Sequence, residues 1–197
     1  MAHGANQIRV IGGRHRGRRL TFVPVRGLRP TPDRVRETLF NWLQADVPGA
    51  RCLDLYAGSG ALGIEALSRG AAFVFAVEQS RQAAQRLAEN VSLLREQGAF
   101  DVRQTDVLRL LRQPPEQAFD IVFADPPFAD RVLPEVCRLL ESNHWLAPEA
   151  VVYLEQDAKA AWAEPPAGWT ISREGSAGQS HQRLLRRNMR NEIMTDL

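Results

Sequence analysis

Apolar strands alternate with amphipathic helices from residue 51 to residue 187, and this alternation constrains the fold of the chain most. Short apolar runs of strand length, separated by helical patterns, recur at Cys52–Tyr56, Phe73–Glu78, Phe119–Ala124 and Val151–Leu154. Such runs are typical of strands buried on both faces, and helical crossovers make neighbouring strands parallel. The pattern therefore predicts an α/β fold whose mostly parallel sheet is covered by helices on both faces.

Three further strands complete the predicted sheet. A weaker strand pattern surrounds Val102, and two more strands are expected around Trp169–Ile171 and Arg183–Leu185. Too few residues separate the last two strands for a helix, so we expect them to form an antiparallel hairpin at one edge. The expected sheet is Rossmann-like and has seven strands.

A glycine-rich loop follows the first strand of this sheet and opens the first helix. Gly58-Ser59-Gly60-Ala61-Leu62-Gly63 has the spacing G-x-G-x-x-G, and Glu78 ends the next strand 20 positions after Gly58. In this context glycines let the backbone approach an adenosine-containing ligand, while the carboxylate accepts hydrogen bonds from ribose hydroxyls. The loop therefore predicts a nucleotide-type cofactor, with a plain strand-to-helix turn as the structural alternative.

Two cofactors compete for such a loop, a nicotinamide dinucleotide and S-adenosylmethionine. Asp54 lies four residues before Gly58, near the carboxyl end of the first strand. Its charge would repel a pyrophosphate and attract the ammonium and sulfonium groups of S-adenosylmethionine, by roughly 4 kcal/mol at about 4 Å and an effective dielectric of about 20. We therefore expect S-adenosylmethionine. Asp106, after the third strand, either accepts a hydrogen bond from the adenine amino group or caps the following helix.

A second motif, Asp125-Pro126-Pro127-Phe128, follows the apolar strand that ends at Ala124. The prolines fix φ and cannot continue a ladder, so the chain leaves the sheet in a stiff extended turn. Asp125 and the Pro126 carbonyl could then accept both N–H bonds of a planar amine whose ring stacks on Phe128. An ordinary turn is the alternative. Because ligands bind outside the carboxyl ends of parallel strands near a switch point, we expect both motifs to face one crevice.

The first 36 residues are strongly basic, although the whole chain has a formal net charge of only +2. They hold nine arginines and one acidic residue, Asp33, whereas the remainder has 16 basic against 22 acidic residues. Arginine forks match phosphate oxygens and stack on bases, so the basic arm predicts nucleic-acid binding, with a solvated tail as the alternative. Ile8–Ile11 and Arg19–Val23 resemble the strands of a hairpin, and the glycines between them suggest an arm that is mobile until it binds.

An amphipathic helix is expected after this hairpin. Thr31 is predicted to be its N-cap, Pro32 its first helical residue and Asp33 a favourable charge near its positive end. We therefore expect a basic arm with its helix at 1–49, an α/β domain at 50–187 and a tail at 188–197.

Composition excludes several classes of protein. No apolar stretch approaches the ~20 residues of a membrane span, and the first residues lack the apolar core of a signal peptide. We therefore expect a cytoplasmic protein that binds no membrane. Cys52 and Cys137 lie among apolar neighbours and are expected to be buried free thiols rather than a disulfide or metal ligands. No metal is expected, because a sulfonium methyl donor is already activated.

The chain resembles a known family, the bacterial 16S ribosomal RNA guanine-N2 methyltransferases that act on the small subunit. The resemblance covers most of residues 8–187 and depends on the basic arm and on three segments, 29–37, 54–66 and 125–128. Tyr56 stands where the family usually has phenylalanine. The resemblance implies a class I methyltransferase that transfers one methyl group from S-adenosylmethionine to N2 of a single guanine in 16S ribosomal RNA, leaving S-adenosylhomocysteine.

Three sets of site residues are expected. The catalytic set is Asp125, Pro126, Pro127 and Phe128. The residues expected to bind the methyl donor are Asp54, Tyr56, Gly58, Ser59, Gly60, Glu78, Gln79, Asp106 and Val107. The residues expected to bind RNA are Arg14, Arg16, Arg18, Arg19, Arg29 and Arg34. The expected partner is 16S ribosomal RNA within an assembled or assembling small subunit.

Other functions stay open at this point. Methyltransferases for adenine N6 or for protein glutamine use related Asn/Asp-Pro-Pro-aromatic motifs, and the choice of nucleobase does not follow from the residues. An RNA-binding assembly factor could keep the fold without catalysis, but a damaged glycine loop or tetrad would then be expected, and both are intact. A nicotinamide-dependent dehydrogenase would have no use for the rigid turn at 125–128.

Overall fold

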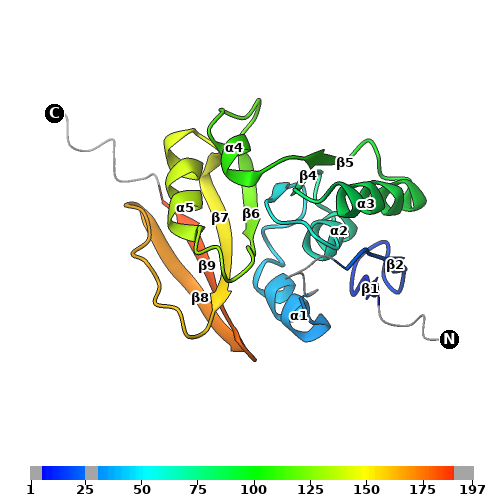
Figure 1. Ribbon diagram of the computed structural model, residues 1–197, viewed down its shortest axis with the longest axis horizontal. Helices are drawn as coiled ribbons and strands as arrows, with labels where there is room; N and C mark the ends of the chain where they lie inside the picture. The colour runs from blue at the N-terminus through cyan, green and yellow to red at the C-terminus, as the bar shows by residue number, and fades with distance from the viewer. Residues whose placement is uncertain (1–5, 25–30, 189–197) are drawn as a thin grey trace.

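A seven-stranded sheet forms the centre of the computed structural model, which describes residues 6–24 and 31–188 (Figure 1). The strand order is β5-β4-β3-β6-β7-β9-β8. The strands are β3 (Arg51–Asp54), β4 (Phe73–Glu78), β5 (Phe100–Gln104), β6 (Phe119–Ala124), β7 (Leu146–Asp157), β8 (Trp169–Ala177) and β9 (Ser180–Arg187). The sheet confirms the α/β fold that the alternation of apolar strands and helices predicts.

The strands β5, β4, β3, β6 and β7 are parallel to one another, and β9 is antiparallel to both β7 and β8. The predicted C-terminal hairpin is therefore present. Its second strand is the interior one: β9 lies between β7 and β8, and β8 forms the edge. Leu184 and Leu185 point to opposite faces of β9 and are both buried, as is typical of an interior strand.

Helices cover both faces of the sheet, as its doubly apolar strands require. Side chains alternate between the two cores along each strand, so Cys52 packs with the first core and Leu53 with the second. The first core contains the apolar faces of α1 (Asp33–Trp42), α2 (Ala61–Ser68) and α3 (Arg81–Leu94). The second contains those of α4 (Val107–Leu111) and α5 (Leu133–Ser142).

Cys52 and Cys137 are buried free thiols, as predicted. They belong to different cores, Cys52 to the first and Cys137 to the second. Burial raises the pKa of Cys137 to about 12 and that of Cys52 further, so both side chains act as small apolar groups. Among the helices of residues 6–24 and 31–188, none has the length and apolar character needed to cross a membrane.

The basic arm is docked on the rest of the molecule. Its strands β1 (Gln7–Arg9) and β2 (Arg19–Thr21) pair antiparallel, and this confirms the predicted hairpin. The fully buried Glu65 of α2 accepts hydrogen bonds at 2.8 Å from the backbone N–H groups of Ile11 and Gly12. The Ser68 carbonyl accepts a further bond from the N–H of Arg14 at 2.8 Å. These hydrogen bonds dock the described part of the arm on α2, and its mobility before binding stays a prediction.

The start of α1 differs from the prediction by one residue. Pro32, with φ −57° and ψ 147°, occupies the N-cap position, and no side chain caps the helix. Thr31 is therefore not the cap. It lies buried one residue earlier, where its hydroxyl hydrogen-bonds to Asp125. The competing partner is in another part of the chain, so local spacing could not reveal it.

Candidate active site

The two motifs leave the sheet from neighbouring strands. The glycine loop follows β3 and the Asp-Pro-Pro-Phe tetrad follows β6, and the two strands are parallel, with Asp54 opposite Phe123. The next strand after β3 in the chain, β4, lies on its other side, so the chain reverses its direction of winding between β3 and β6. Such a switch point opens a crevice at the carboxyl edge of an α/β sheet. Both motifs therefore lie at the carboxyl edge of the sheet, after two neighbouring strands.

The glycine loop has backbone conformations that suit glycine. Gly58 and Gly60 have φ of 51° and 78°, in the left-handed region. A Cβ atom on Gly60 would come within 2.3 Å of Leu87 Cδ1, and one on Gly63 within 3.1 Å of Val74 and Phe100. The loop thus packs α2 closely on the sheet. The N-cap residue Gly60 makes no side-chain cap hydrogen bond, but the N–H of Gly63 in the first turn of α2 donates to Asp54, so the N–H groups before Gly63 are the ones suited to an anionic group of a ligand.

Glu78 holds the loop from the end of β4. Its carboxylate accepts hydrogen bonds from the N–H of Gly58 at 2.8 Å and from the N–H of Ser80 at 2.7 Å. These bonds fix the side chain beside the loop while leaving lone pairs on both oxygens. The position suits the predicted contact with ribose hydroxyls.

Asp54 lies beneath the loop rather than on its surface. The residue is 2% exposed, and its Oδ2 accepts a hydrogen bond from the N–H of Gly63 at 3.0 Å. Burial raises the pKa of Asp54 to about 7; the charge of Glu78 adds to this, while the N–H groups of Gly63 and Tyr56 oppose it. Asp54 is therefore suited to act on a donor through its charge, and it also orients the loop.

The other residues predicted to bind the methyl donor differ in burial and in their contacts. Asp106 caps α4, with Oδ1 accepting from the N–H of Arg109 at 2.8 Å, so the capping alternative is confirmed and the adenine contact stays a prediction. Burial raises the pKa of the Tyr56 phenol, and the charges of Asp106 and Asp130 raise it further, so Tyr56 lies near both carboxylates. Ser59 and Val107 are buried, whereas Gln79 is exposed.

The tetrad presents one acid and one aromatic ring at the crevice. Asp125 is half-buried, Pro126 is buried, and Phe128 is 38% exposed, unusual for a large apolar side chain. Burial raises the pKa of Asp125 well above its ordinary value, the charges of Glu155 and Asp54 raise it further, and the hydrogen bond from Thr31 opposes them. An exposed ring beside a fixed acceptor can stack on a planar amine, as the motif predicts.

A cavity of about 800 Å³ opens beside the tetrad. Pro126 and Phe128 line it on one side, and Trp162 lines it on another, with the guanidinium carbon of Arg183 4.5 Å from the centre of the indole ring. The donor-loop residues Asp54, Gly58 and Glu78 do not line it. The cavity is therefore distinct from the predicted donor pocket.

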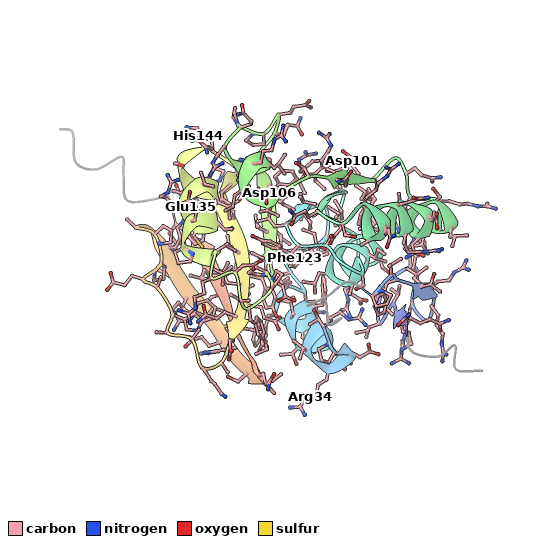
Figure 2. All side chains as sticks on the ribbon, viewed as in Figure 1. Arg34, Asp101, Asp106, Phe123, Glu135 and His144 are labelled. Carbon is pink, nitrogen blue, oxygen red and sulfur yellow. The ribbon has the colours of Figure 1, made fainter. Side chains whose placement is uncertain are left out.

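The arginines predicted to bind RNA are not all equivalent. Arg14 forms an ion pair with Glu96 at 2.9 Å. Arg16, Arg18 and Arg19 are exposed, and within residues 6–24 and 31–188 they have no ion pair. Arg34 is exposed on α1, and Figure 2 shows it pointing away from the sheet. Arg29 lies outside the described residues.

The tip of the arm lies away from the crevice. Arg14 and His15 hydrogen-bond to Ser68, the last residue of α2, whereas the glycine loop precedes the first residue of that helix. Eight helical residues separate the two ends by roughly 12 Å. The structure therefore brings the two motifs together but places the arm's tip at the other end of α2.

Two residues that interact with the tetrad were not predicted as site residues. Thr31 was expected to cap a helix, and its bond to Asp125 could not be inferred from spacing. Glu155 is an acidic residue near the end of an apolar strand, as Asp54 and Glu78 are, and that signal was present in the sequence. Recognising it would have required the order and register of β6 and β7.

Comparison with known proteins places the chain among methyltransferases. The family model described as "Conserved hypothetical protein 95" matches residues 8–186. The chain is 46% identical to "Ribosomal RNA small subunit methyltransferase D" of Escherichia coli over 98% of its own length and 96% of the relative, and 42% identical to the protein of that name in Haemophilus influenzae over 90% and 93%. The solved structure named "Putative methyltransferase yhhF from Escherichia coli" is 47% identical, covers 92% of this chain and 98% of its own, and has a TM-score of 0.86.

Proposed function

This chain belongs to the family described as conserved hypothetical protein 95, and we propose that it transfers a methyl group from S-adenosylmethionine to the exocyclic N2 of a guanine in 16S ribosomal RNA. One observation carries the proposal: an adenosine-type glycine loop and an intact Asp-Pro-Pro-Phe tetrad follow neighbouring parallel strands at the same edge of the sheet. The names of the relatives support a ribosomal RNA substrate of the small subunit.

The loop residues fit the methyl donor. Glu78 would accept the ribose hydroxyls, the α2 N-terminus would hold the donor's carboxylate, and the charge of Asp54 would favour its cationic groups. The donor supplies an electrophilic methyl group on a positively charged sulfur. A pyrophosphate cofactor fits less well, because the carboxylate of Asp54 lies directly beneath the loop.

The tetrad would make the guanine amine reactive. The N2 lone pair is delocalised into the ring, so Asp125 and the Pro126 carbonyl would accept its two N–H bonds and direct the lone pair toward the methyl group. Phe128 would stack on the base, which contributes roughly 1–3 kcal/mol. When the N–C bond forms, N2 must lose a proton, and the raised pKa of Asp125 suits it to receive that proton. Alignment of N2 with the methyl group at about 3–3.5 Å supplies much of the acceleration.

Replacing the catalytic carboxylate tests this mechanism. We expect Asp125→Ala to lower the methylation rate by about 10²–10⁴ while S-adenosylmethionine still binds, because Asp125 touches the amine and not the loop. Asp125→Asn keeps an acceptor but cannot take the proton, so its rate should lie between those of the wild type and the alanine variant. Single-turnover methylation and calorimetric donor binding measure the two effects separately. Methylation by Asp125→Ala near the wild-type rate would remove Asp125 from the mechanism.

Mapping the labelled nucleotide tests the substrate. The protein is incubated with radiolabelled S-adenosylmethionine and, in parallel, with naked 16S ribosomal RNA, free small subunits and assembly intermediates. We expect label on N2 of one guanine in at least one of these substrates. Label on an adenine or on a protein glutamine would instead support the methyltransferases that share related tetrads, and binding without transfer would support an assembly factor.

A further inference from the structure

A buried carboxylate, Glu155, lies beside the half-buried Asp125. Strands β6 and β7 are parallel with Ala124 opposite Leu154, so the next residues, Asp125 just after β6 and Glu155 within β7, lie side by side. The charge of Glu155 acts on Asp125. Glu155 is 6% exposed and lines the cavity bordered by Pro126 and Phe128. The tetrad mechanism makes no use of it.

Hydrogen bonds fix the orientation of the Glu155 carboxylate. The Tyr153 hydroxyl donates to its Oε2 at 2.6 Å, and the Ser180 hydroxyl donates to its Oε1. Gln182 donates in turn to the Ser180 oxygen at 2.5 Å. Within the described parts of the chain no arginine, lysine or histidine forms an ion pair with Glu155. The site thus holds a rigid acceptor without a neutralising cation, which is costly for a group that only links strands.

Guanine and adenine differ at the position next to their amines. In guanine the N2 amine is flanked by N1–H, a donor, whereas in adenine the N6 amine is flanked by N1, an acceptor. An acceptor group beside the pair that receives the amine therefore complements guanine and repels the N1 lone pair of adenine. A buried acceptor left unpaired by the wrong base disfavours that base strongly.

We propose that Glu155 accepts the N1–H of the target guanine and determines the enzyme's choice of guanine over adenine. The inference rests on the proposed function, since it assumes a guanine amine at Asp125. Glu155 would be a specificity residue: it touches the base beside the reacting nitrogen, and Tyr153 and Ser180 hold it in place. It supplies a physical reason for the nucleobase choice that the tetrad alone leaves open.

An exchange of base and side chain tests the assignment. Once the methylated guanine is mapped, a substrate carrying 2-aminopurine at that nucleotide keeps the N2 amine but has an unprotonated N1. We expect the wild type to favour guanine over 2-aminopurine by tenfold or more in kcat/KM. Glu155→Gln presents an amide N–H that can donate to the N1 of 2-aminopurine, so the preference should fall at least tenfold or reverse. A purely structural role would slow both substrates equally and leave the ratio unchanged.

Controls separate the possible failures. Glu174→Gln makes the same change on the edge strand β8 and should keep the wild-type ratio. Donor binding checks that Glu155→Gln is folded; if it is lost, Glu155→Asp, which withdraws the carboxylate by one methylene, should also lower the guanine preference. An unchanged ratio in the folded variant, or a wild type indifferent to the two bases, overturns the assignment of Glu155. Absence of any N2 methylation by the wild type refutes the proposed function instead.

Discussion

Three neighbouring strands each have a carboxylate at or near their carboxyl end. Asp54 ends β3, Asp125 follows β6 and Glu155 lies near the end of β7, and their charges act on one another through Asp125. Each is held by a hydrogen-bond donor. The row runs from the predicted donor loop to the predicted base site, so it supplies negative charge for a cationic sulfur and acceptors for an amine.

The raised pKa of Asp54 predicts that donor binding depends on pH. Asp54 is protonated in the free protein below about 7, and a cationic ligand favours its ionised form. Affinity for S-adenosylmethionine should therefore fall as the pH drops from 8 to 6, by at most about tenfold per unit. Asp54→Asn should lose this dependence and keep only that of the ligand itself. Calorimetric titrations at several pH values measure both, and identical pH profiles would show that Asp54 does not act through its charge.

The backbone of the glycine loop predicts that alanine variants of two glycines differ in their affinity for the methyl donor. Gly60 and Gly49 have nearly the same φ, 78° and 79°, but a Cβ atom meets Leu87 at 2.3 Å at Gly60 and no atom within 4 Å at Gly49. Both alanine variants bear the cost of a left-handed residue, about 1 kcal/mol. Gly60→Ala should also displace the loop and weaken donor binding at least tenfold, whereas Gly49→Ala should bind normally. Equal affinities would show that the loop tolerates a side chain.

At the scale of elements, a buried acid is one of the groups that hold the arm on the rest of the molecule. Glu65 of α2 accepts from two backbone N–H groups of the arm, pairs with Arg69 at 2.7 Å and lies 3.7 Å from Arg36 of α1. Arg36, one of the nine N-terminal arginines, is itself only 2% exposed. It joins arm, α1 and α2 rather than facing a partner. The basic arm is thus partly a structural element.

Removal of Glu65 should therefore release the arm. Glu65→Ala leaves the N–H groups of Ile11 and Gly12 without their acceptor and removes one charge partner of the buried Arg36, and we expect it to lower the free energy of unfolding by about 3–5 kcal/mol. Glu89→Ala is the matched control, because Glu89 pairs with Arg86 on the surface of α3 and should contribute less than about 1 kcal/mol. Urea unfolding measures both. Equal losses would show that Glu65 does not anchor the arm.

The parts of the fold that could be predicted are those encoded by short-range patterns. The seven strands and the Asp106 cap of α4 depend on neighbouring residues and were recognisable. The anchoring of the arm by Glu65 and the bond from Thr31 to Asp125 join residues more than 50 positions apart. Local propensity contains no information about such pairs, and the role of Glu155 likewise depends on the register between strands.

At the scale of the whole molecule, the basic arm and the tetrad lie in different places. Figure 1 shows the β1–β2 hairpin at the opposite end of the molecule from β8, and the arm's tip touches the ends of α2 and α3 that face away from the crevice. RNA that reaches both the arm and the tetrad must therefore extend across the molecule. The exposed arginines should then act on affinity rather than on chemistry.

The salt dependence of RNA binding tests this division. Replacing Arg16 and Arg18 with alanine should reduce the slope of log affinity against log salt by about 0.7–0.9 for each phosphate that is no longer neutralised, with the single-turnover rate at saturating RNA unchanged. Arg112→Ala with Arg173→Ala removes the same charge from exposed sites outside the arm and should preserve the slope. A slope unaffected by the first pair would exclude those arginines from the interface.

The interior position of β9 also imposes an order of assembly. β8 touches the sheet only through β9, although it precedes β9 in the chain. The earlier strand can join the sheet only together with the later one or after it, and a hairpin that formed first would dock against β7 as a unit. On this view, a substitution at Gly178, in the turn between β8 and β9, would slow the folding of the sheet without contacting the tetrad.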